Sequence, residues 1–127
     1  MRICIDARWI FPELSGVGLY TQELIRALAR ADRENEYLLL FQHVDVQERT
    51  RAAGFDEQYP RNHAIRAPDG VCSPRNKATL PLLLARHRVD LYHSTNYMMP
   101  LVRVSSVRRA VTIHDMIPLL FPDHATK

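Results

Sequence analysis

The chain has 127 residues, of which 46% are hydrophobic and 24% are charged, and its formal net charge is +3. This length suits one domain, and the composition is that of an ordinary globular protein with enough apolar side chains for a core. No apolar run approaches the roughly 18 residues that a membrane span needs. The arginines are scattered rather than clustered, so we expect no nucleic-acid partner.

The first half of the chain predicts two buried strands with a helix between them. Ile3, Cys4 and Ile5 form a short apolar run within residues 2–7, which is typical of a strand in a parallel sheet. A loop over 8–14 precedes a helix that has Ser15 as its N-cap. The apolar stripe expected on this helix consists of Tyr20, Leu24, Ala27, Leu28 and Ala31. Residues 36–41 predict the second strand, and a short helix is expected around 46–53.

The second half continues the alternation of strands and helices. We expect an edge strand over 63–66, a turn over 68–70, and further strands over 90–93 and 109–113. Residues 73–88 predict a helix with Leu80, Leu83, Leu84 and His87 on one face. Pro81 implies that this helix begins near Thr79 or bends at the proline. The pattern as a whole predicts an α/β fold with a doubly wound, mostly parallel Rossmann-like sheet of about five strands.

In such a sheet, ligands bind at the carboxyl ends of the strands, near the point where the strand order reverses. Residues 6–18, 42–45, 93–97 and 114–115 follow predicted strands and are expected at this edge. Three of these four segments are rich in polar, glycine or histidine residues. The sequence therefore predicts a site there.

Gly16, Val17 and Gly18 open the first predicted helix. Glycines at a helix start let a backbone approach a phosphate, and the helix end supplies amide donors and a positive dipole. The same residues could simply begin a helix. Thr21 stands where a dinucleotide fingerprint requires a glycine, and the long 8–14 loop also departs from that motif. These departures disfavour an NAD-dependent oxidoreductase.

Two further segments carry side chains suited to chemistry. His114 with Asp115 follows the fifth predicted strand, where an imidazole could accept, donate or orient a proton at a sugar hydroxyl. His93, Asn96 and Tyr97 lie in a loop rich in hydroxyl, amide and aromatic groups, and Met98 and Met99 add an adaptable apolar wall. Both segments also have purely structural readings. The two cysteines, Cys4 and Cys72, and the remaining histidines show no metal-ligand spacing, so we expect no metal site.

Taken together and in order, these segments resemble family 4 glycosyltransferases of the "glycosyl transferases group 1" type, including bacterial mannosyltransferases. The segments that carry the resemblance are residues 2–8, 15–21, 80–84, 90–94 with 96–97, and 112–118. The resemblance implies a retaining GT-B enzyme, of which residues 1–127 form part of the N-terminal, acceptor-side domain. It implies further that the donor-binding domain lies outside this chain, so that the fragment alone is inactive.

The resemblance also assigns roles to residues. It implies that Gly16 and Gly18, with Ser15 and Val17, lie near the diphosphate of a nucleotide-sugar donor. His114 is expected beside the transferred sugar as the catalytic residue, with Asp115 orienting that region. His93, Asn96 and Tyr97 are expected to bind substrate.

The expected partners are a nucleotide-sugar donor, a glycan or lipid-linked acceptor and the missing donor domain; no cofactor or metal is expected. We expect a cytoplasmic location, with peripheral association at the inner face of the membrane and dimerisation through the exposed edge of the fifth strand as further expectations. The alternative is a non-catalytic Rossmann-like module that binds a nucleotide or works with a separate donor subunit.

Overall fold

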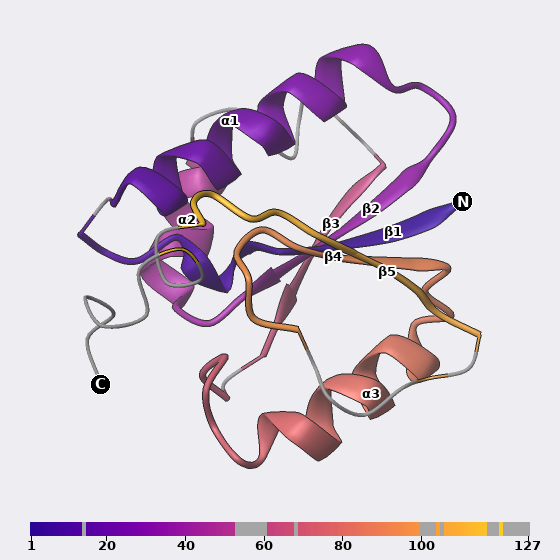
Figure 1. Ribbon diagram of the computed structural model, residues 1–127. Helices are drawn as coiled ribbons and strands as arrows, with labels where there is room; N and C mark the ends of the chain where they lie inside the picture. Colours follow the sequence, from indigo (N-terminus) through magenta and orange to yellow (C-terminus); the bar gives the residue numbers. More distant parts are fainter. Residues whose placement is uncertain are drawn as a thin grey trace.

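One parallel sheet organises the chain, and its five strands run in the order β3-β2-β1-β4-β5 (Figure 1). The computed structural model describes residues 1–13, 15–52, 61–67, 69–99, 104, 106–116 and 120. The strands are β1 (Arg2–Asp6), β2 (Glu36–Phe41), β3 (Asn62–Arg66), β4 (Leu91–Ser94) and β5 (Arg108–Val111). The helices are a 3-10 turn η1 (Ala7–Trp9), α1 (Gly16–Ala31), α2 (Val44–Ala52) and α3 (Asn76–Arg86).

The sheet is doubly wound. The chain moves outward from β1 through β2 to β3, then crosses back to place β4 on the other side of β1 and β5 beyond it. The strand order therefore reverses between β1 and β4. This arrangement confirms the predicted α/β Rossmann-like fold, with β3 as an edge strand as expected. β5 forms the other edge, and dimerisation through it stays a prediction.

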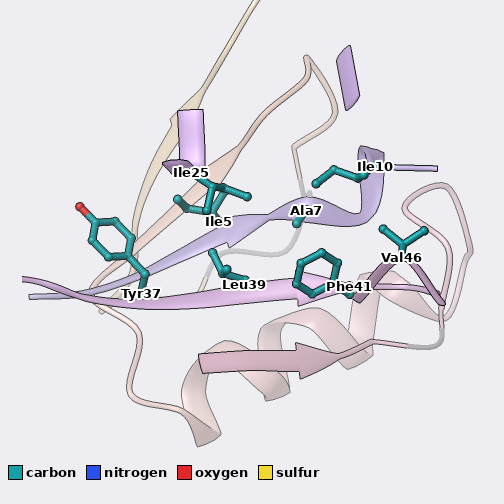
Figure 2. Close-up of a cluster of buried hydrophobic side chains, with 8 residues drawn as sticks. All are labelled: Ile5, Ala7, Ile10, Ile25, Tyr37, Leu39, Phe41 and Val46. Atoms are coloured by element: carbon teal, nitrogen blue, oxygen red, sulfur yellow. The ribbon is translucent and has the colours of Figure 1, made fainter. Parts of the chain in front are cut away.

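Side chains that alternate along the strands pack into two separate hydrophobic clusters, one on each face of the sheet. On one face, Ile5 and Leu39 pack with Ile25 of α1 and Val46 of α2, and Ile10 and Phe41 close the end of this cluster at which β2 ends (Figure 2). On the other face, Cys4 and Leu38 pack with Leu80 and Leu84 of α3. Because consecutive strand residues point to opposite faces, one short apolar run such as 3–5 supplies both cores.

A buried ion pair ends β1. The Arg8 guanidinium donates to both carboxylate oxygens of Asp6, at 2.9 Å from Nε and 2.6 Å from Nη2, and both side chains are fully buried. Arg8 Nη1 also donates to Asn76 Oδ1 at 2.7 Å, and the Tyr92 hydroxyl donates to Asp6 Oδ2 at 2.5 Å. Burial alone would lower the pKa of Arg8, but the hydrogen bonds and charge of Asp6 raise it above its usual value. The pair thus ties β1 to α3 and β4.

The buried face of α1 differs from the predicted one. The structure buries Gly18, Thr21, Ile25 and Ala29, whereas Tyr20 is exposed. The helix is rotated by about one residue, or about 100°, from the expected orientation. Gly18 and Thr21 are the buried residues of its first half, where the helix contacts η1, and the Thr21 hydroxyl donates to the Val17 carbonyl at 2.8 Å. The buried side of this half of the helix therefore consists of small residues, and the hydroxyl of Thr21 is satisfied within the helix.

Two local expectations also need correction. Residues 7–9 form the 3-10 turn η1 instead of extending β1 to residue 7 and opening a plain loop at residue 8, because the Asp6 carboxylate accepts from the Arg8 amide at 3.2 Å. Helix α3 begins at Asn76, not near Thr79, and contains Pro81. Pro81 has no amide hydrogen to donate to the Lys77 carbonyl, and Lys77 is an exposed residue of α3.

Removal of the Arg8 charge should destabilise the fold strongly. We expect Arg8→Met to lower the free energy of unfolding by about 3–5 kcal/mol, because it leaves the buried Asp6 carboxylate without its counter-charge. The control is Arg26→Gln, which breaks the exposed Glu23–Arg26 pair on α1 and should cost less than about 1 kcal/mol. Urea unfolding of both variants measures the difference. Equal losses of unfolding free energy in the two variants would show that the buried pair stabilises the fold no more than the exposed pair does.

Candidate functional site at the carboxyl edge of the sheet

The loops that follow β1 and β4 flank the point where the strand order reverses. Residues 7–15 lead from β1 into α1, and residues 95–99 follow β4. The segment after β5 reaches the same edge and runs toward the start of α1 (Figure 1). Three of the four segments expected at the carboxyl edge are therefore adjacent here. The fourth, residues 42–45, follows β2 on the other side of β1.

The start of α1 is open to approach. The Ser15 hydroxyl accepts from the Gly18 amide at 3.2 Å, which confirms Ser15 as the N-cap. Gly16 is exposed, and a Cβ added there would meet nothing within 4 Å. Gly18 is buried and Val17 half-buried against the protein. A ligand could thus reach the first turn at Gly16, at the positive end of the helix dipole.

His114 lies against two other segments of this edge. Its Nε2 is 2.9 Å from the backbone carbonyl oxygen of Thr95. A carbonyl only accepts hydrogen bonds, so Nε2 must carry the proton, and Nδ1 of the neutral ring is then the acceptor. The ring meets Tyr20 of α1 edge to face, with centroids 4.8 Å apart. The imidazole is therefore held in one orientation while the residue stays exposed.

A chain of polar groups holds Tyr20 from the other side. The Tyr20 hydroxyl is 3.2 Å from Thr112 Oγ1, and Thr112 Oγ1 is 2.9 Å from His93 Nε2. Burial lowers the pKa of His93, which favours the neutral ring. His93 and His114 thus reach Tyr20 by different routes, one through Thr112 and one directly. The sequence predicts both histidines as site residues, but it does not predict Tyr20 or Thr112.

A signal for Tyr20 was present in the sequence. It follows Gly16 by four residues, and positions i and i+4 share one side of a helix. An open glycine at the first turn therefore implies that the side chain at position 20 borders the same space. The apolar periodicity of the helix instead places the Tyr20 ring in the core, so it gives no indication that Tyr20 borders the space at Gly16.

The loop after β4 is held mainly by its own polar side chains. The buried Ser94 hydroxyl lies 2.7 Å from the Asn96 carbonyl and 2.5 Å from the Met98 carbonyl, and the Thr95 hydroxyl donates to the Asp6 carbonyl at 2.9 Å. Asn96 is 7% exposed, and its Oδ1 accepts from the amide of Tyr97 at 2.9 Å. These groups shape the backbone on which His114 rests.

The predicted site residues divide into two sets. Ser15, Gly16, His93 and His114 belong to the α1 side of the edge, and Asp115 is exposed next to His114 in the chain. Tyr97 instead lines a cavity with residues at the start of α3. Within the described ranges, no group of three or more His, Cys, Asp or Glu side chains converges as a metal site would require. The described helices include none with the length and apolarity to cross a membrane.

His93 should make stability depend on pH. Its folded-state pKa lies below the ordinary value of about 6.5, so the unfolded chain binds this proton more tightly. The stability that comes from the neutral His93 ring is fully present above a pH of about 6.5, and it is lost as the pH falls from there toward the lowered pKa of the folded state. We expect His93→Gln to reduce the drop in unfolding free energy between pH of about 7.5 and about 5.5. Urea titrations at both values test this, and an unchanged drop would contradict it.

The chain matches no family model, no curated protein and no solved structure.

Proposed function

We propose that the chain is the acceptor-side portion of a retaining glycosyltransferase of the GT-B type, which moves a sugar from a nucleotide-sugar donor to a glycan or lipid-linked acceptor. One observation carries the proposal. Tyr20 joins the open start of α1 to His114 at the point where the strand order reverses. The start of α1, whose free amides suit a phosphate, and the oriented His114 ring therefore lie together on the α1 side of the carboxyl edge.

Each part of this arrangement suits one part of a nucleotide sugar. The backbone at Gly16 can approach a diphosphate because no side chain intervenes, and the helix dipole favours the negative charge. The Nδ1 acceptor of His114 suits a sugar hydroxyl, since Nε2 is already engaged by Thr95. Stabilisation of the departing diphosphate is the main catalytic demand in such a transfer, and we assign most of it to the donor domain.

The other predicted substrate-binding residues have supporting roles in this proposal. His93 holds Thr112, which in turn holds Tyr20, and Asn96 shapes the loop that carries the Thr95 carbonyl. Asp115 remains a candidate for orienting the sugar region. The alternative, a non-catalytic nucleotide-binding module, would use the start of α1 but would not need His114.

Gly16 offers a clean test of diphosphate binding. Gly16→Ala adds a methyl group into space that is free of protein atoms within 4 Å, so it should leave stability unchanged or raise it by up to about 1 kcal/mol. We expect it to weaken binding of GDP-mannose or UDP-glucose about tenfold or more, because the methyl group blocks the backbone. Calorimetric titration measures the affinities, with each variant made in the longest protein that the coding sequence specifies. Gly70→Ala, whose Cβ would sit at an ordinary 3.6 Å from Gln42, is the matched control. Equal affinity of the parent protein and Gly16→Ala for the donors would show that the diphosphate does not bind at the start of α1.

His114 separates the enzyme from the binding module. In the longest protein that the coding sequence specifies, we expect His114→Ala to lower kcat about 100-fold or more while donor affinity changes little. Release of nucleoside diphosphate from the two donors reports turnover. His63→Ala, which changes a histidine 53% exposed in its side chain and paired with Glu36, is the control and should act like the parent protein. Donor binding without any turnover in the parent protein would favour the module instead.

A further inference from the structure

A cavity lies on the face of the sheet that α3 covers, between the start of α3 and the loop after β4. Its volume is about 390 Å³, which is within the range of about 300–1,000 Å³ typical of small-molecule sites. Tyr92 lines it, and strand alternation sends Tyr92 to the face opposite His93. The cavity is therefore separate from the arrangement around Tyr20 and His114.

The buried end of this cavity offers apolar contact. Tyr92 and Asn76 are its most buried lining residues, and their polar atoms are already engaged. The Tyr92 hydroxyl donates to Asp6, while the Asn76 amide accepts from Arg8 and donates to the Val71 carbonyl at 2.9 Å. A ligand atom at this end would thus meet mainly the Tyr92 ring and aliphatic groups, with the second N–H of the Asn76 amide as a hydrogen-bond donor.

The walls of the cavity are held in place before any ligand binds. Tyr92 and Asn76 are anchored on the buried Asp6–Arg8 pair, and the Ser94 hydroxyl holds the backbone at Met98. Met99 packs against the apolar cluster beneath α3. Such a cavity loses little conformational freedom on binding, and methionine side chains adapt to ligands of varied shape.

The open end of the cavity differs in character. Tyr97 is 66% exposed, which leaves a large aromatic surface uncovered by the described protein. Lys77 is exposed and carries the single full charge among the described residues that line the cavity, and Ser73 adds a hydroxyl. An ammonium and a hydroxyl beside an aromatic ring suit an anionic group at the mouth.

We infer that this cavity binds a small amphiphilic anion, with its apolar body against Tyr92, Met98 and Met99 and its anionic head at Lys77. The shared chemistry is an alkyl or ring system that carries a phosphate, sulfate or carboxylate. The inference stands on the cavity alone and does not depend on glycosyl transfer. Loss of nucleotide binding at α1 would leave it intact.

Cys72 supplies a built-in reporter for this site. It lines the cavity and is exposed, whereas Cys4 is fully buried and its burial raises the pKa of its thiol. We expect n-octyl phosphate, used as a monomer, to slow the labelling of Cys72 by monobromobimane in a saturable way. Octanol should bind about fivefold more weakly and so protect Cys72 less, because it lacks the charged group that would contact Lys77. Inorganic phosphate alone should give no protection.

Variants test the two ends of the ligand separately. Lys77→Gln should weaken the binding of n-octyl phosphate about fivefold and leave the affinity for octanol unchanged. Tyr97→Ala should weaken the binding of both compounds. Arg86→Gln removes the same charge from the last turn of α3 and should behave like the parent chain. Thermal unfolding checks that each variant is folded. Absence of saturable protection, equal protection by inorganic phosphate, or parent-like affinity of Lys77→Gln would overturn the inference.

Discussion

The buried pair between Asp6 and Arg8 is the constraint on which the carboxyl edge of this sheet depends. It lies at the end of β1, beside the reversal of strand order, and it draws in Tyr92 from 86 residues away and Asn76 from 68 residues away in the chain. Two charges without water are costly to bury unless their hydrogen bonds are complete. Here both carboxylate oxygens of Asp6 accept from the guanidinium, and the remaining Nη1 group of Arg8 donates to Asn76 and the Asp69 carbonyl. The loops after β1 and β4 consequently take their positions from one network.

Two chemically different surfaces lie on either side of this network at the carboxyl edge of the sheet. On the α1 side, His93, Thr112 and Tyr20 form a polar chain that leads to His114. On the α3 side, Tyr92 forms the buried end of an apolar cavity. Adjacent residues of β4 reach opposite faces because side chains alternate along a strand. The loop that follows β4 therefore contributes to both surfaces, with Thr95 supporting His114 and Tyr97 bordering the cavity.

The hydroxyl and amide groups of this loop show how residue type can mislead. A segment such as Ser94 to Tyr97 has the composition of a sugar-binding loop, yet Ser94, Thr95 and Asn96 are buried and bond to backbone atoms. Buried polar groups must find partners, and in a short loop the nearest partners are its own amides and carbonyls. In this loop the exposed ring of Tyr97 takes no part in such bonding, and in the segment after β5 Nδ1 of His114 stays available while Nε2 bonds to Thr95.

The sequence by itself determined the element order, the parallel sheet and the Ser15 cap, whereas the site at the carboxyl edge stays a prediction. These properties are local or periodic: apolar runs of strand length, a hydroxyl before a helix, and the shared direction of the strands. Only the tertiary structure decided that α1 turns Thr21 inward and Tyr20 outward, and that Arg8 is buried rather than part of an open loop. Both outcomes depend on partners far along the chain, Thr112 for Tyr20 and Asn76 for Arg8, and no spacing within one segment encodes such a contact.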